Sequence, residues 1–179
     1  MVTDEKLYSR FLQGEDRAFD EIIDLYRDRI TFFIFSFVKN KETAEDIAMD
    51  VFVEILVHPK RYKFKGSFKS YIYSIAHHKA VDFIRRNREI PCEGYSFKDD
   101  FKNEDIFKSE NNEILYRAMK HLNDDYRRVL CLVYFEQLES EEIQIIMGKN
   151  KRQIANLTYR AKQALKAELI KEGFQYEKF

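Results

Sequence analysis

The chain has 179 residues, of which 35% are charged and 45% are hydrophobic, and its formal net charge is zero. This length can bury one good core or two small ones. Five glycines and two prolines are too few for the many turns of a β-rich protein. The composition therefore favours an all-helical fold.

The two cysteines, Cys92 and Cys131, share no metal-binding spacing, which favours a reduced cytosolic protein. The first residues lack the charged and apolar segments of a signal peptide. The most apolar stretch, residues 31–38, is too short to span a bilayer. We therefore expect a cytoplasmic protein.

Charge is strongly segmented along the chain. Residues 1–56 contain 13 acidic and 7 basic residues, whereas residues 60–88 contain one acidic and 9 basic residues. Residues 143–171 are basic again, with 7 basic residues and one acidic residue. Two basic segments separated by acidic sequence predict two contacts with a polyanion. The acidic segments either meet a basic partner or remain solvated.

The first half of the chain has the apolar periodicity of helices. Between Phe19 and Phe37 the apolar residues follow one helix face. Phe32 and Phe35 lie off that face, so we expect this end of the helix to be buried on several sides or covered by a partner. Asn40 is the predicted N-cap of a second helix. Its predicted inner stripe consists of Ala44, Ile47, Ala48, Val51, Phe52, Ile55 and Leu56.

The segment VHPKRYKFKGS, residues 57–67, predicts a basic loop with interleaved aromatic residues. Ser67 is the predicted N-cap of a third helix that continues to Arg85 and Arg86. Exposed aromatic rings among cations suit unpaired bases better than an intact duplex. An inward face of Ile72, Ile75, Ala76 and Phe83 leaves Tyr71, Ser74, His78, Asp82 and Arg85 on an outward stripe.

The second half begins after an acidic segment without periodicity, residues 89–110, which predicts a linker. Asn123 and Ser140 are predicted N-caps, and Gly148 is a predicted helix stop. A short helix, a tight turn and a longer basic helix form a helix-turn-helix pattern. In the last helix Arg152, Asn156, Tyr159 and Gln163 face outward, flanked by Lys149, Lys151 and Arg160.

His77, His78 and Asp82 match the HHxxxD signature of acyl-transfer and condensation enzymes. Those enzymes are large α/β proteins that carry the signature in a loop, whereas this chain is short and strand-poor. On a helix the two histidines point to different sides, and His78 and Asp82 can pair. We therefore interpret the segment as part of a nucleic-acid-binding helix.

Four segments, taken in order, resemble the extracytoplasmic-function (ECF) sigma factors of bacterial RNA polymerase. They are AFDEIIDLYRDRI, TAEDIAMDVFVEIL, FKGSFKSYIYSIAHHKAVDFIRR and LNDDYRRVLCLVYFEQLESEEIQIIMGKNKRQIANLTYRAKQAL. The sequence departs from the family pattern at Thr43, Met49, Tyr71, His78, Ala155 and Leu157, which affects the details of promoter choice.

The resemblance implies an all-α fold of two small domains joined by an acidic linker. The expected boundaries are 1–90, 91–112 for the linker, and 113–179 for the helix-turn-helix domain. The implied function is an alternative sigma factor that binds the β′ clamp and β flap of core RNA polymerase and directs initiation at promoter DNA. No cofactor, metal, catalytic residue or small-molecule substrate is implied. An anti-sigma factor is an expected further partner, and it could hold the protein at the membrane.

The resemblance also assigns site residues. Core polymerase binding falls to Glu45, Asp46, Asp50, Phe52 and Glu54. Contact with the −10 element falls to Arg61, Tyr62, Lys63, Phe64, Lys65, Tyr71, Ser74, His78, Asp82, Arg85 and Arg86. Contact with the −35 element falls to Lys149, Lys151, Arg152, Asn156, Tyr159 and Arg160. The alternative is a stand-alone helix-turn-helix regulator that binds duplex DNA without polymerase.

Overall fold

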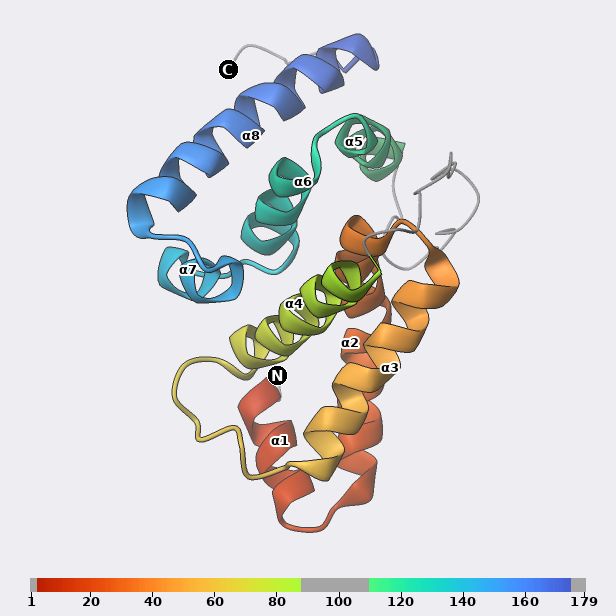
Figure 1. The fold of residues 1–179 in the computed structure, drawn as a ribbon, viewed down its shortest axis with the longest axis vertical. Helices are drawn as coiled ribbons and strands as arrows, with labels where there is room; N and C mark the ends of the chain where they lie inside the picture. Colours follow the sequence, from red (N-terminus) through yellow and green to blue (C-terminus); the bar gives the residue numbers. More distant parts are fainter. Residues whose placement is uncertain (1–2, 88–109, 175–179) are drawn as a thin grey trace. The chain divides into compact units, whose positions relative to one another are not determined.

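The computed structural model describes residues 3–87 and 110–174, and in these ranges the chain forms helices and no strands (Figure 1). The chain divides into two compact units. One contains α1 (Asp4–Leu12), α2 (Asp16–Val38), α3 (Lys41–Val57) and α4 (Phe68–Arg86). The other contains α5 (Glu110–Lys120), α6 (Asp124–Leu130), a π-helical turn (Cys131–Phe135) and α8 (Lys151–Lys171), with α7 (Ser140–Met147) preceding α8. The all-α expectation is confirmed.

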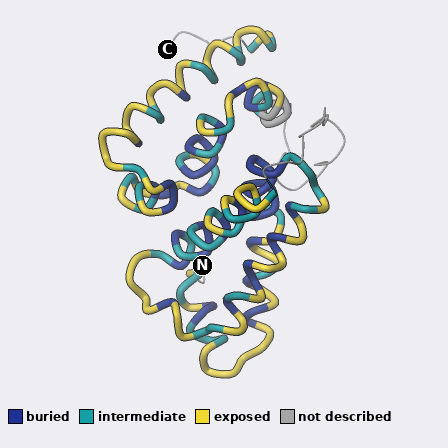
Figure 2. Tube along the Cα trace, in the orientation of Figure 1, coloured by how far each residue is buried: buried dark blue, intermediate teal, exposed yellow. Residues whose placement is uncertain are grey.

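In the first unit, α2 packs against α1, α3 and α4. Its buried face includes Phe19, Ile22, Tyr26, Ile30 and Phe33, which follow the helical spacing expected from the sequence. Figure 2 shows buried positions recurring along all four helices of this unit. The sequence did not separate α1 from α2. The break between them contains Gly14, whose φ of +92° is a left-handed conformation that glycine adopts readily.

The end of α2 is buried on several sides. Every residue from Ile30 to Val38 is buried, including Phe32 at 7% exposure and Phe35 at 1%. Of the two alternatives expected from the sequence, burial on several sides is confirmed, and neither ring is available to a partner at the surface.

Local capping signals define where α3 and α4 begin. The amide of Thr43 donates to the Asn40 side chain at 2.8 Å, and the amide of Ser70 donates to the Ser67 hydroxyl at 3.1 Å. Both predicted N-caps are confirmed. The predicted inner stripe of α3 is buried except at Leu56, which is 50% exposed.

The second unit is organised around a buried arginine. Arg127 of α6 donates to the carbonyl oxygens of Met119 at 3.1 Å, Lys120 at 3.0 Å and Leu122 at 2.8 Å. These carbonyls lie at and just after the end of α5, where the last carbonyls of a helix have no amide four residues further along the helix to bond them. Arg127 therefore joins α6 to the end of α5.

The second half of the chain contains the predicted order of a short helix, a turn and a longer helix. Asn123 caps α6 by accepting from the amide of Tyr126 at 2.9 Å, as predicted. Ser140 is the first residue of α7, one position inside the helix that it was expected to cap, and the Glu139 amide donates to Glu142 at 3.0 Å instead. Gly148, with a φ of +61°, separates α7 from α8 as expected.

The predicted acidic linker lies outside the described residues except for its last few positions, where α5 begins at Glu110. Within the described ranges, no helix combines the length and apolar character needed to cross a bilayer.

Candidate nucleic-acid interface

The loop between α3 and α4 carries most of the basic and aromatic residues predicted to contact unpaired DNA. Arg61, Lys63, Phe64 and Lys65 are exposed. Phe64 is 48% exposed and has a φ of +55°, a left-handed conformation that is uncommon for a residue with a side chain. The loop therefore presents one aromatic ring between two cations.

Tyr62 does not share this exposure. It is 4% exposed, its hydroxyl donates to the Gly66 carbonyl at 2.8 Å, and its ring stacks on Tyr71 at a centroid distance of 5.2 Å. Tyr71 is partly buried, and this burial raises the pKa of its hydroxyl. The structure therefore makes Tyr62 a support of the loop and not the exposed platform that the sequence suggested.

The outward stripe of α4 is present in part. His78, Arg85 and Arg86 are exposed, whereas Ser74 is half-buried and its hydroxyl donates to the Ser70 carbonyl at 2.8 Å. Asp82 forms an ion pair with Arg85 at 3.1 Å. The pairing of Asp82 expected with His78 is thus replaced by pairing with the arginine one turn away.

The histidines of the HHxxxD match lie in the middle of α4. The ring of His77 packs against Phe37 of α2 at a centroid distance of 5.5 Å, whereas His78 is exposed. Among the described residues no group of three or more His, Cys, Asp or Glu side chains could hold a metal ion. The arrangement fits a helix with one packed face and one basic face.

The predicted polymerase-binding residues of α3 divide into two groups. Glu45, Asp46 and Asp50 are exposed. Phe52 is only 1% exposed and belongs to the core, so its side chain is not available to a partner. Glu54 is half-buried and is already paired with Arg61 of the loop and with Lys79 of α4, the latter at 3.8 Å.

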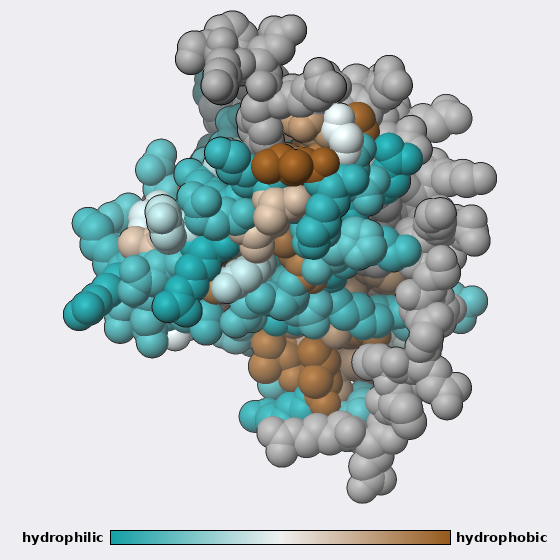
Figure 3. All heavy atoms as spheres, turned by 90° about the horizontal axis from the view of Figure 1, so that it is seen from above, coloured by the Kyte–Doolittle hydropathy of each residue, from teal (hydrophilic) through white to brown (hydrophobic). Residues whose placement is uncertain are grey.

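An exposed apolar stripe on α3 was missed in the sequence. It consists of Met49, Val53, Leu56 and Val57, which recur at the spacing of one helix face. Figure 3 shows a largely hydrophilic surface with apolar groups confined to smaller patches, so an exposed apolar helix face is informative. The inner stripe alone supplies the core of α3. The apolar residues on a second face of the helix were therefore the sequence signal that could have revealed an exposed binding surface.

The start of α8 is defined by a capping box. The Gln153 amide donates to the Asn150 side chain at 2.9 Å, and the Asn150 amide donates to the Gln153 side chain at 2.9 Å. The spacing Asn-x-x-Gln could have predicted this motif. It fixes the first turn of α8, from which Lys151 and Arg152 project as exposed side chains.

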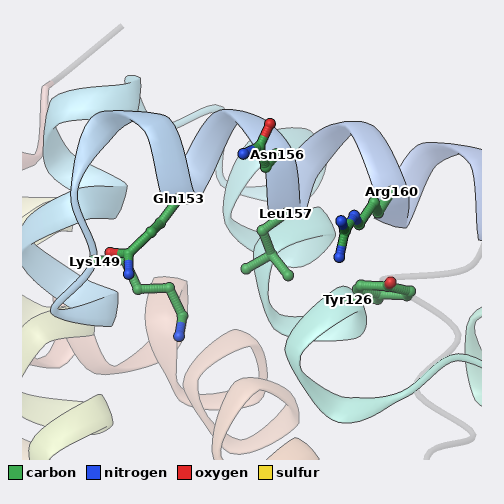
Figure 4. A pocket seen from close by; sticks show the side chains of 6 residues that line it. All are labelled: Tyr126, Lys149, Gln153, Asn156, Leu157 and Arg160. Carbon is green, nitrogen blue, oxygen red and sulfur yellow. The ribbon is translucent and has the colours of Figure 1, made fainter.

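Three predicted −35 contacts gather at one groove. Lys149, Asn156 and Arg160 line it together with Gln153, Leu157 and Tyr126, and its volume is about 250 Å³. In Figure 4, Leu157 and Arg160 point toward Tyr126 of α6, whereas Asn156 points away from it. Leu157 is half-buried. The groove combines cationic, amide and aromatic groups beside the start of α8.

Arg152, Tyr159 and Lys151 are the predicted −35 contacts that do not line this groove. Arg152 is exposed and Tyr159 is 66% exposed. Lys151 lies 3.9 Å from Glu141 of α7, and Lys149 lies 3.9 Å from Asp125 of α6. Such exposed pairs are weak, so both lysines can exchange their partners for phosphates.

Comparison with known families covers both units. Residues 22–90 match the family Sigma-70 region 2, and residues 112–165 match Sigma-70, region 4. RNA polymerase sigma factor SigV of Bacillus subtilis is 31% identical over 152 residues, which cover 83% of this chain and 86% of that protein. The chain belongs to the ECF sigma factors of the sigma-70 family.

This ECF sigma factor has further relatives of similar length. RNA polymerase sigma factor YlaC of Bacillus subtilis is 29% identical over 167 residues, which cover 85% of this chain and 94% of that protein. The protein is thus an alternative sigma factor that binds core RNA polymerase and directs promoter-specific transcription initiation.

Solved structures share its fold. CnrH, determined in complex with the cytosolic domain of CnrY, has a TM-score of 0.63 at 17% identity and covers 93% of this chain and 97% of that one. RpoE of Bartonella quintana was determined in complex with the anti-sigma factor NepR. It has a TM-score of 0.62 at 18% identity, and the match covers 86% of this chain and 96% of RpoE.

Proposed function

We propose that three separate surfaces of this ECF sigma factor carry out its function. The exposed face of α3 binds core polymerase, the loop at 58–67 with the basic side of α4 contacts the −10 element, and the start of α8 reads the −35 element. The observation that carries this assignment is that each surface exposes side chains of the type that its proposed partner would bind. These side chains are acidic and apolar on α3, cationic and aromatic on the loop, and cationic with amides on α8.

The α3 surface has the composition of a protein interface. Met49, Val53 and Leu56 provide an apolar centre, and Asp46 and Asp50 provide charge beside it. Interfaces combine such a centre with a polar rim, and the carboxylates favour a basic partner and fast association. We assign this surface to the β′ clamp of core polymerase and the second unit to the β flap.

The −10 contact is assigned to the loop and to α4. Phe64 offers an exposed ring on which an unpaired base can stack, and Lys63 and Lys65 beside it can neutralise phosphates. Arg61, His78, Arg85 and Arg86 extend the basic surface. Tyr62 and Tyr71 support this surface through their stacked rings. Capture of an extruded base offsets an unstacking cost of roughly a few kcal/mol.

The −35 contact is assigned to the first turns of α8. A recognition helix contacts base edges with residues near its N-terminus and phosphates with flanking cations. Arg152 and Asn156 are the exposed side chains suited to base edges, while Lys149, Lys151 and Arg160 are suited to phosphates. Tyr159 adds an exposed aromatic ring.

We infer that an anti-sigma factor regulates the protein, because RpoE, a protein of the same fold, was solved in complex with the anti-sigma factor NepR. A partner that covers the apolar stripe of α3 would block polymerase binding directly. Location in the cytoplasm, and at the membrane when such a partner is membrane-bound, follows from this proposal. We further infer that the sigma factor contributes binding and positioning, while the polymerase carries out the chemistry.

Run-off transcription tests the assignment. Purified bacterial core polymerase is incubated with fragments of the protein's own genome, with the wild type, Val53→Asp, Phe64→Ala or Arg152→Ala. The wild type should produce specific transcripts whose start sites reveal the promoter elements. Val53→Asp should lose polymerase binding, Phe64→Ala should bind polymerase but open promoters poorly, and Arg152→Ala should lose dependence on the −35 sequence. Tight duplex binding without polymerase would support a stand-alone regulator instead.

A further inference from the structure

The helix α1 contacts the loop between α3 and α4, although α1 precedes the matched sigma-70 region 2 segment at 22–90. Tyr8 of α1 is fully buried, and its hydroxyl donates to the carbonyl oxygen of Pro59 at 2.6 Å. Its ring packs on Phe68 at a centroid distance of 4.7 Å and edge-on against Tyr62 at 5.4 Å. Tyr8 thus contacts the beginning of the loop and the start of α4.

Glu5 contacts the other end of the same loop. Its carboxylate accepts from the backbone amide of Phe68, the first residue of α4, at 3.1 Å. A carboxylate at this position also interacts favourably with the helix N-terminus. Glu5 and Tyr8 are three residues apart and lie on one face of α1. One short helix therefore holds both ends of the segment from Pro59 to Phe68, which passes beside it in Figure 1.

The held segment contains backbone that needs support. Phe64 has a φ of +55° and Gly66 a φ of +79°, and a left-handed residue with a side chain persists only where its surroundings maintain it. The ring of Tyr8 lies 6.2 Å from the ring of Phe64. Fixing the loop in the free protein also removes part of the entropy cost of ordering it when DNA binds.

We propose that Tyr8 and Glu5 are positioning residues that hold the 58–67 loop in the conformation that captures an unpaired promoter base. This inference rests on the proposed role of the loop at the −10 element. Neither side chain contacts DNA in this proposal. Both act through the backbone of the loop, by way of Pro59 and Phe68.

A control for simple packing exists within the same unit. The hydroxyl of Tyr26 on α2 donates to Asp4, also on α1. Tyr26 is fully buried like Tyr8, but this hydrogen bond joins α1 to α2 and does not involve the loop. Tyr26→Phe therefore removes a buried hydroxyl and an α1 contact of the same kind as Tyr8→Phe while leaving the loop's own hydrogen bonds intact.

The experiment compares Tyr8→Phe, Glu5→Ala, Glu5→Gln and Tyr26→Phe in the full-length protein. Hydrogen exchange in the free protein reports on amides 60–66, and permanganate reactivity of −10 thymines in the polymerase complex reports on promoter opening. We expect Tyr8→Phe and Glu5→Ala to speed exchange in 60–66 and to reduce opening about two- to tenfold, the range for loss of one hydrogen bond. Glu5→Gln keeps an acceptor oxygen, so its exchange in 60–66 and its promoter opening should lie between those of Glu5→Ala and the wild type. Tyr26→Phe should not speed exchange in 60–66 specifically and should not reduce promoter opening.

Two outcomes would overturn the proposal. Exchange in 60–66 that responds equally to Tyr8→Phe and Tyr26→Phe would show that α1 acts only by packing. Faster exchange with unchanged opening would show that the loop's conformation does not limit base capture. Phe64→Ala separates these results from the proposed function. If Phe64→Ala opens promoters normally, the assignment of the loop fails, whereas defective Phe64→Ala with normal Tyr8→Phe refutes the positioning role alone.

Discussion

The carboxylate of Glu54 on α3 pairs with the guanidinium of Arg61 in the following loop. Lys79 of α4 lies 3.8 Å from the other oxygen of the same carboxylate. Glu54 therefore connects three segments of the first unit. Its negative charge is partly neutralised within the protein, whereas Asp46 and Asp50 on the same helix remain exposed.

This difference predicts unequal effects on polymerase binding. Glu54→Gln should change the affinity for core polymerase little, because the Glu54 carboxylate is already paired with Arg61 and Lys79 within the protein. Asp50→Lys should weaken binding roughly tenfold or more, since it places a positive charge opposite a basic partner. Fluorescence anisotropy with labelled protein at several salt concentrations measures both. Equal losses for the two variants would remove the distinction between Glu54 and the exposed carboxylates.

The start of α8 predicts two kinds of defect in −35 recognition. If the Arg152 guanidinium binds a base edge with two hydrogen bonds, Arg152→Ala should weaken binding to the cognate −35 element by about 1 to 3 kcal/mol. Transcription from that element should fall accordingly. Arg160→Ala should instead weaken binding similarly on all sequences and reduce the salt dependence by about one unit of slope. Run-off assays on promoters with cognate and altered −35 elements separate the two. An undiminished preference for the cognate element in Arg152→Ala would exclude Arg152 from base reading.

Features specified by neighbouring residues were predictable from the sequence. The N-caps Asn40, Ser67 and Asn123 and the stop at Gly148 depend only on side chains within a few positions. The order of four family-like segments predicted the two domains and the sigma-factor function. These signals are local, or linear along the chain, and need no knowledge of packing.

Which residues are buried by contacts with other segments was less predictable. Phe52 and Leu56 are one helical turn apart on α3, yet one is buried and the other is half-exposed. Tyr62 lies in a loop, where no periodicity predicts burial. The contacts of α1 with Pro59 and Phe68 span 51 and 63 residues of sequence, so no local pattern contains them.

Arg127 predicts a large effect on stability. Arg127→Met should lower the free energy of unfolding by about 2 to 4 kcal/mol, because it removes the guanidinium that donates to the carbonyls of Met119, Lys120 and Leu122. Arg160→Met, at an exposed position of α8, should stay within about 0.5 kcal/mol. Urea unfolding followed by circular dichroism measures both. Similar midpoints for the two variants would show that water replaces the buried guanidinium without cost.

Tyr8 predicts a loss of stability at alkaline pH. Burial, with smaller contributions from Tyr71 and Tyr62, raises the pKa of the Tyr8 hydroxyl from 10.0 to about 12. Between these values the folded protein keeps a proton that the unfolded chain releases. The free energy of unfolding therefore falls as pH rises through this window, by at most about 1.4 kcal/mol per pH unit for one proton. Below pH 10 the contribution is fully present.

Tyr8→Phe lacks this proton, so the stability difference between the wild type and Tyr8→Phe should be constant up to about pH 10 and shrink above it. Urea titrations from pH 8 to 11 measure the difference. Tyr134→Phe serves as the control, because Tyr134 is half-exposed, whereas Tyr8 is fully buried. A Tyr8→Phe curve that runs parallel to the wild type across the whole range would mean that the hydroxyl of Tyr8 is not buried in solution.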